Sequence, residues 1–359
     1  MTRKRVTLRM LAQQTGFDVS TISRVLRDDS TLSIRPENIQ RIKDVARALN
    51  YVPDTAARSL RSARSYSIAA VLPSLQNQIH AQIVEGASHV CRERGYSLVM
   101  AHVDPRKSAV AVVSELVLRN RIDGLLLLTF REELRDLLAR GQLDVPVMAV
   151  NWRARGFDHW VVLDEAPGAR LATEHLIALG HRRIAHLSGN LSRFNAAQRF
   201  AGYQEALAAA GLPFDAELVE AAGYGYEDGK RAMLAMLDRN PGDFSAVFAV
   251  SMLAAAGAVS ALHQRGLRVP QDMSVVGFND AILAEVMNPS LSTVAYPLGE
   301  MGANAARGMI GLLEGQHSHV QQMLGGARLV HRASSAHMPS QGANGAPNAS
   351  ANQPKGPRP

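Results

Sequence analysis

The sequence predicts a small all-α domain at the N-terminus, followed by a short linker and a large α/β core. Residues 1–50 show only the apolar spacing of short helices, whereas residues 66–335 alternate apolar, strand-like runs with helical segments. Continuous apolar strands that alternate with helices indicate parallel sheets covered on both faces. Because this pattern is too long for one core, it predicts two doubly wound lobes.

Three short helices account for the N-terminal domain. Thr7 is placed to cap the first helix and Asp18 the second, since Thr and Asp side chains accept hydrogen bonds from backbone N–H groups at a helix start. Gly16 supplies the turn between these two helices. Pro36 opens the third helix, because proline suits the first helical position. Two helices joined by so short a turn predict a helix-turn-helix domain.

The expected strands of the core are, in chain order, "SIAAVLP", "YSLVMAHV", "GLLLLTF", "PVMAVN", "RIAHLSG", "AVFAVS" and "MSVVGFND". Helical segments such as "HAQIVEGASHVCRERG" and "NAAQRFAGYQEALAAAG" separate them. We therefore expect a helix-turn-helix domain at 1–53, a linker at 54–65, the two-lobed core at 66–335 and a tail at 336–359. The tail is rich in Gly, Pro, Asn and Ser, which predicts disorder.

Simple features narrow the class of protein. The single cysteine, Cys91, allows no internal disulfide, which fits a reducing cytoplasm. The basic N-terminal residues are not followed by the apolar stretch of a signal peptide. No apolar run reaches the length of a membrane span. We expect a cytoplasmic protein with no membrane partner.

The positive charge of the chain is confined to its N-terminal part. The net charge is +7, and residues 1–64 alone hold 13 Lys and Arg against 6 Asp and Glu, which gives the same +7. A basic module on a neutral body indicates a polyanionic partner such as nucleic acid for the module alone. The alternative is a solvated cationic tail.

The segment "GFDVSTISRVL", residues 16–26, divides into two faces. On a helical wheel Ile22, Val25 and Leu26 form an apolar arc that can dock on the other two helices. The opposite side could enter the major groove of DNA, where Arg24 can donate two hydrogen bonds to guanine. The candidate DNA contacts on or next to this helix are Val19, Ser20, Thr21, Arg24 and Arg27. Taken alone, the helix could equally be an amphipathic surface helix.

In its ordered set of motifs the chain resembles the LacI/GalR family of bacterial transcription regulators, over residues 6–335. The matching pieces are "LRMLAQQTGFDVSTISRVL", "NYVPDTAARSLRS", "EHLIALGHRRIAHLSG", "RFAGYQEALAAAG", "RVPQDMSVVGFND" and "PSLSTVAYPLGEMG". The resemblance implies a periplasmic-binding-protein-like core of two lobes. It also implies a homodimer that binds a pseudo-palindromic operator, with pairing of dimers left open.

The resemblance implies further DNA contacts outside the second helix. The linker would fold into a hinge helix on DNA, where Leu60 matches the leucine that family members wedge into the minor groove. Ala57 and Arg58 lie beside it, and Thr7 is a further candidate at the start of the first helix. Operator affinity would respond to a small-molecule effector between the lobes, with no other cofactor.

For the effector site, Arg199 in "QRFAGY" matches the arginine with which the family clamps its effector. A guanidinium can hold the paired oxygens of a sugar or a carboxylate. The effector could therefore be a sugar, a sugar acid or another small metabolite. The remaining candidates follow strands or fall at cleft positions: Asn151, Tyr224, Ser251, Asn279, Asp280 and Tyr296. Ser251 and Met252 replace the family's usual Asn-Asp pair, which makes the cleft less suited to a polyol.

Enzyme chemistry finds little support in the sequence. Phosphate-binding, zinc-protease, serine-hydrolase and CxxC motifs are absent. His175 and His181 do not share a helical face and make poor metal ligands, and Cys91 lies on an apolar helix stripe. We therefore expect a repressor rather than an enzyme. The alternative is a small-molecule binding module whose basic domain serves RNA or a protein partner.

Overall fold

The computed structural model describes residues 6–26, 31–49, 51, 64–75, 77–103, 108–120, 122–129, 132–139 and 143–338. The chain divides into two compact units, Met1–Ser65 and Tyr66–Pro359. In the described residues no helix is long and apolar enough to cross a membrane.

The described residues of the first unit include the helices α1 (Leu8–Thr15), α2 (Val19–Val25) and α3 (Pro36–Ala48). The three predicted helix starts are confirmed: Thr7 and Asp18 accept hydrogen bonds from backbone N–H groups, and Pro36 is the first residue of α3. Gly16 ends α1 at φ 77°, in the left-handed region that glycine adopts without strain. The buried core of this unit consists of Leu11, Ile22, Val25, Ile42 and Ala46.

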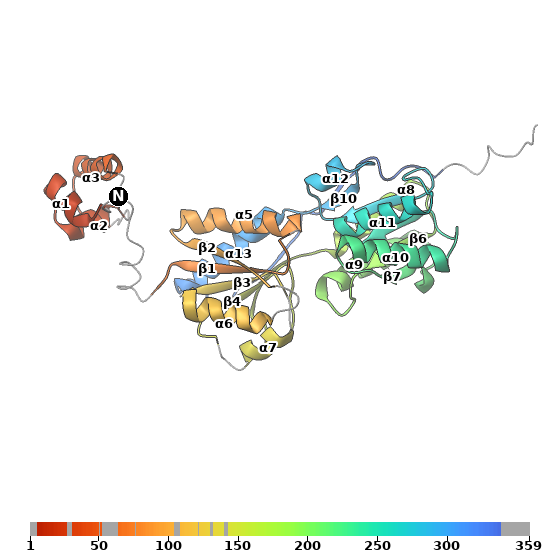
Figure 1. The fold of residues 1–359 in the computed structure, drawn as a ribbon, viewed down its shortest axis with the longest axis horizontal. Helices are drawn as coiled ribbons and strands as arrows, with labels where there is room; N and C mark the ends of the chain where they lie inside the picture. The colour runs from red at the N-terminus through yellow and green to blue at the C-terminus, as the bar shows by residue number, and fades with distance from the viewer. Residues whose placement is uncertain are drawn as a thin grey trace, which may run out of the picture. The chain divides into compact units, whose positions relative to one another are not determined.

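The second unit contains two lobes, each built on a six-stranded sheet (Figure 1). The first sheet has the strand order β11-β5-β4-β3-β1-β2, with every neighbouring pair parallel. Its strands are β1 (Ser67–Leu72), β2 (Ser97–His102), β3 (Gly124–Leu127), β4 (Val147–Val150), β5 (His159–Leu163) and β11 (Gln321–Leu324). Its helices are α5 (Gln78–Glu93), α6 (Ala109–Asn120), α7 (Glu132–Ala139) and α13 (Leu298–Leu313).

The second sheet has the equivalent order β12-β10-β9-β8-β6-β7, and only β12 is antiparallel. Its strands are β6 (Ile184–Ser188), β7 (Val219–Ala221), β8 (Ala246–Ala249), β9 (Ser274–Phe278), β10 (Ser292–Ala295) and β12 (Arg328–Val330). Its helices are α8 (Ala166–Ala178), α9 (Phe194–Ala209), α10 (Tyr226–Arg239), α11 (Met252–Gln264) and α12 (Ile282–Val286), with a 3-10 turn at Ala216–Leu218. The predicted pair of doubly wound lobes is confirmed.

Close helix pairs cover one face of each sheet. In the first lobe α5 packs on α13, and in the second α9 packs on α8. Both contacts depend on a glycine, because a methyl group at Gly86 would lie 1.9 Å from the Gly299 carbonyl oxygen and one at Gly202 would lie 2.1 Å from that of Ala166. Figure 1 shows α13, drawn in blue, returning to the orange and yellow elements of the first lobe.

The chain crosses between the lobes after β5, after β10 and after β11. The hydroxyl of Tyr296 in the second crossover donates to the carbonyl oxygen of Asp164 in the first, at 2.6 Å. Because β5, β10 and β11 each run toward the opposite lobe, the carboxyl ends of the parallel strands of both sheets meet at the lobe junction. Open α/β sheets bind ligands at these ends.

Residues 336–338, which the sequence assigned to the tail, pair with the second lobe. The Met338 amide donates to the Leu179 carbonyl oxygen at 2.9 Å, and the carbonyl oxygen of Ala336 lies 3.2 Å from Nε2 of His181. The rest of the expected tail lies outside the described residues.

Candidate functional site

The exposed start of α2 is organised by Asp18. Its Oδ1 accepts from the Thr21 amide at 2.9 Å and from the Ser20 hydroxyl at 2.5 Å, while Oδ2 accepts from the Thr21 hydroxyl at 2.6 Å. The hydrogen bonds from Ser20 and Thr21 hold the pKa of Asp18 well below its ordinary value. Asp18 therefore stays ionised, and the hydroxyl protons of Ser20 and Thr21 are both directed at it.

The other predicted DNA contacts are placed as follows. Thr7 is exposed and caps α1, and Val19 is half-buried. Arg24 is half-buried and donates through Nη2 to the Thr31 hydroxyl at 2.9 Å. Four further candidates lie outside the described residues, namely Arg27, Ala57, Arg58 and Leu60.

Arg199 is the sixth residue of α9, and its side chain is 2% exposed. Its Nε donates to Oε2 of Glu165 at 2.9 Å, its Nη2 donates to Oε1 of the same carboxylate at 2.8 Å, and its Nη1 donates to the Val250 carbonyl oxygen. Glu165 is fully buried and directly precedes α8, on the first crossover. The Arg199 guanidinium, which we expected to bind an effector, therefore binds a carboxylate of the chain itself.

Two aromatic rings lie near the guanidinium of this ion pair. The Arg199 guanidinium carbon lies 4.1 Å from the ring centre of Phe278 and 5.6 Å from that of Tyr224. Burial is the largest influence on Arg199 and lowers its pKa, but the interactions with Glu165, Tyr224 and Tyr296 together raise the pKa above its ordinary value.

Three other predicted effector residues use their polar groups inside the protein. The Ser251 hydroxyl caps α11 and donates to the Tyr224 carbonyl oxygen at 2.8 Å. The Asp280 carboxylate pairs with Arg332, at 2.7 and 3.1 Å. The Tyr296 hydroxyl bonds to Asp164, as described above.

Asn151 and Asn279 differ from these residues in their side-chain carbonyl oxygens, which have no hydrogen-bond partner among the described residues. They follow β4 and β9, which are equivalent strands of the two sheets, and both have φ 67° in the left-handed region. The Oδ1 atom of each side chain is buried with no hydrogen-bond partner in the described part of the chain. An orphaned buried amide is costly unless a ligand or water satisfies it.

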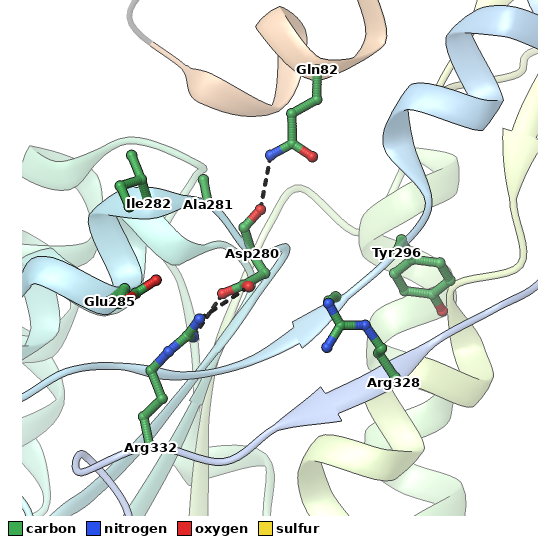
Figure 2. A pocket seen from close by; sticks show the side chains of 9 residues that line it. Gln82, Asp280, Ala281, Ile282, Glu285, Tyr296, Arg328 and Arg332 are labelled. Carbon is green, nitrogen blue, oxygen red and sulfur yellow. Dashed lines mark hydrogen bonds and ion pairs between the residues drawn. The ribbon is translucent and has the colours of Figure 1, made fainter. Parts of the chain in front are cut away.

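A polar pocket of about 270 Å³ opens at the junction of α5, α12 and the second crossover (Figure 2). In Figure 2 Gln82 reaches from α5 to the Asp280 carbonyl oxygen, at 3.0 Å, and Arg332 approaches the Asp280 carboxylate from the opposite side. Only Asp280 and Tyr296 of the predicted effector residues line it. Arg199 does not line this pocket, and its side chain is buried.

Glu165 and Phe278 were not predicted as site residues from the sequence. Phe278 sits directly before Asn279, and Glu165 follows Asp164, where an apolar strand ends. An acidic residue placed there is a signal that could have indicated a counter-ion for Arg199. Cys91 is buried, and burial raises the pKa of its thiol to about 11. In the described residues no group of three or more His, Cys, Asp or Glu side chains could hold a metal ion.

Comparison with known proteins identifies the family. Residues 173–335 match the model of the periplasmic binding protein-like domain. The HTH-type transcriptional regulator CelR of Thermobifida fusca is 33% identical over 327 residues, which cover 88% of this chain and 94% of the relative. The chain belongs to the LacI/GalR family of transcriptional regulators. It is a DNA-binding transcriptional regulator whose activity responds to a small-molecule effector.

Solved structures of this family share the fold of the chain. A complex of CelR with cellobiose has a TM-score of 0.68 at 32% identity, covering 92% of this chain and all of that one. The lac repressor dimer, bound to operator and the anti-inducer ONPF, has a TM-score of 0.73 at 27% identity, covering 93% of this chain and all of that one. These proteins are regulators, and the match extends over both units of the present chain.

Proposed function

We propose that this regulator is a cytoplasmic, homodimeric repressor that reads double-stranded operator DNA with α2, and that its effector binds at the lobe junction. The observation that carries the effector site is the pair of orphaned amides, Asn151 and Asn279, at the junction where both sheets end. Arg199, Tyr224 and Phe278 would supply the wall of the site from the second lobe. The lac repressor is a dimer on its operator, which supports the dimer proposed here.

On the DNA side, Arg24 is the residue that we propose as the main base reader. The protons of Ser20 and Thr21 are directed at Asp18, so these hydroxyls are better placed to accept from base amino groups than to donate to phosphates. The ionised Asp18 would repel the phosphates of the DNA backbone and so weaken binding to non-operator DNA. Leu60 and its neighbours in the linker remain proposed minor-groove contacts.

The two sites are coupled through the lobe angle in this proposal. Gln78 and Gln82 of α5 bond to the backbone around α12, and the Arg153 guanidinium carbon lies 5.2 Å from the ring centre of Trp160 and 4.4 Å from that of Phe194. These contacts join the lobes in one relative orientation. An effector that prefers one orientation shifts the equilibrium by its differential affinity, and so changes operator binding.

Selection of binding sites by the full chain from a random pool of DNA duplexes tests the DNA half of the proposal. We expect a palindromic sequence to be enriched, and Arg24→Ala to lose about 1–3 kcal/mol of discrimination at one position of each half-site. Arg47→Ala removes the same charge from the end of α3 and serves as the control. If no sequence is enriched, or if RNA binds equally well, the alternative of a binding module with another basic partner gains support.

Thermal-shift screening of the full chain against sugars, sugar acids, nucleobases and aromatic acids tests the effector half. A ligand of the proposed site should raise the melting temperature of the wild type and lose this effect in Asn279→Gly. Glycine tolerates the left-handed backbone of Asn279 while it removes the amide. A ligand that shifts operator binding but ignores both Asn279→Gly and Asn151→Gly would place the site elsewhere.

A further inference from the structure

Arg199 and Glu165 form a buried ion pair in which each side chain binds the other. Both side chains are at most 2% exposed, and the carboxylate takes two hydrogen bonds from one guanidinium. The backbone of Glu165 is fixed as well, because its amide donates to Oε1 of Gln198 at 2.8 Å. Gln198 precedes Arg199 on α9, so this hydrogen bond fixes the backbone of Glu165 next to Arg199.

Stability does not explain this pair. Removing two charges from water costs several kcal/mol per ion, and a packed apolar pair of similar volume is often at least as stable. The first lobe illustrates the apolar solution, since the sixth residue of α5 is Ile83, which is 1% exposed. At equivalent positions the second lobe therefore has the charged Arg199 and the first lobe the uncharged Ile83.

The pair has a direct consequence for ligand chemistry. An anionic effector would have to displace Glu165 from the two guanidinium donors or lie against its like charge in a buried site. A neutral ligand meets neither cost. Asn279 directly follows Phe278, whose ring lies beside Arg199, and its buried Oδ1 has no partner among the described residues. A ligand hydroxyl can donate to this oxygen.

We propose that Glu165 determines the effector class: it serves as a built-in counter-ion of Arg199, so the site accepts an uncharged, hydroxyl-bearing ligand and rejects carboxylates. The inference rests on the proposed effector site beside Arg199. It narrows the expected effectors by excluding sugar acids.

Chemical rescue in the full chain tests the inference without knowledge of the effector. Glu165→Ala leaves a buried guanidinium with no counter-ion and a space of carboxylate size, so its melting temperature should fall by roughly 10 °C. Sodium acetate should restore it in a saturable manner, whereas acetamide and sodium chloride at equal concentration should not. The double variant Glu165→Ala with Arg199→Met should show no acetate effect.

Each outcome decides the question. If Glu165→Ala is insoluble, it is expressed and purified with acetate or with chloride; solubility only in acetate supports the inference, and insolubility in both counts against it. The absence of a saturable acetate effect overturns it. The inference is also overturned if a sugar acid such as glucuronate raises the melting temperature of the wild type but not that of Asn279→Gly. Rescue involves neither DNA nor effector. Success here together with failure of the Asn279→Gly test would therefore keep Glu165 as the counter-ion of Arg199, but it would reject the proposed effector site and with it the effector class.

Discussion

The two lobes of the core have the same strand order but place different side chains at equivalent positions. α5 and α9 each follow the first strand of their lobe, and the ninth residue of each, Gly86 or Gly202, permits a close helix contact. Three residues earlier the first lobe has Ile83 and the second has Arg199. The shared glycines serve the fold, whereas the arginine is an addition that the fold does not require.

The comparison also separates two kinds of polar residue. Asn151 and Asn279 are equivalent in both sheets, with the same left-handed backbone and the same orphaned Oδ1. The buried guanidinium of Arg199 and the rings of Tyr224 and Phe278 beside it belong to the second lobe. We infer that both lobes contribute hydrogen bonds to an effector, while the second lobe supplies the wall that selects its charge.

The largest expected effect comes from replacing Arg199 with an uncharged residue, as at the equivalent position of the first lobe, while Glu165 is kept. Arg199→Met strands the buried Glu165 carboxylate and should lower the free energy of unfolding by about 3–5 kcal/mol. The double variant Arg199→Met with Glu165→Leu should recover most of this loss, as urea unfolding of the full chain would show. Ile83→Met is the control in the first lobe and should cost less than about 1.5 kcal/mol. A double variant as unstable as the single one would contradict the comparison.

Smaller effects are expected where the lobes are alike. Gly86→Ala and Gly202→Ala each push a methyl group into a backbone carbonyl oxygen, and each should cost about 1–3 kcal/mol in the same unfolding experiment. At Gly299 the nearest atom to an added methyl is 3.7 Å away, so Gly299→Ala should be tolerated. Unequal costs at Gly86 and Gly202 would show that the helix pairs are not equivalent.

The paired asparagines should have little influence on stability. Asn151→Gly and Asn279→Gly each remove an amide that has no protein partner, so the free energy of unfolding should change by about 1 kcal/mol or less. Binding of an effector, measured by calorimetry, should weaken in both variants. Loss of binding in Asn279→Gly alone would assign the effector to the second lobe.

The last expected effect appears only in acid. Burial, reinforced for His175 by the neighbouring His331, lowers the pKa of His175 to about 4, and burial does the same to His186. The folded state then binds fewer protons than the unfolded state, so this stability is complete above about pH 6.5 and is lost as the pH falls toward 4. The difference in melting temperature between pH 7 and pH 5 should shrink in His175→Gln. An unchanged difference would show that His175 does not contribute.

Local patterns predicted much of the fold. Helix caps at Thr7 and Asp18, the turn at Gly16 and the apolar strands of both lobes follow from short-range preferences, and the structure has them where the sequence indicated. The strands β5, β7, β10, β11 and β12 were not predicted. They are short or flank the crossovers, and their pairing depends on segments far apart in the chain.

The sequence by itself determined the family, the basic helix-turn-helix domain and the two-lobed α/β core, and it singled out Arg199 as a candidate. Only the tertiary structure decided what Arg199 does, because Glu165 lies 34 positions earlier in the chain and on another element. The structure likewise showed that Ser251, Asp280 and Tyr296 form hydrogen bonds or ion pairs within the protein. The side-chain oxygens of Asn151 and Asn279 have no such partner among the described residues. Whether a polar group is available to a ligand depends on its partners in space, and spacing along the chain does not record them.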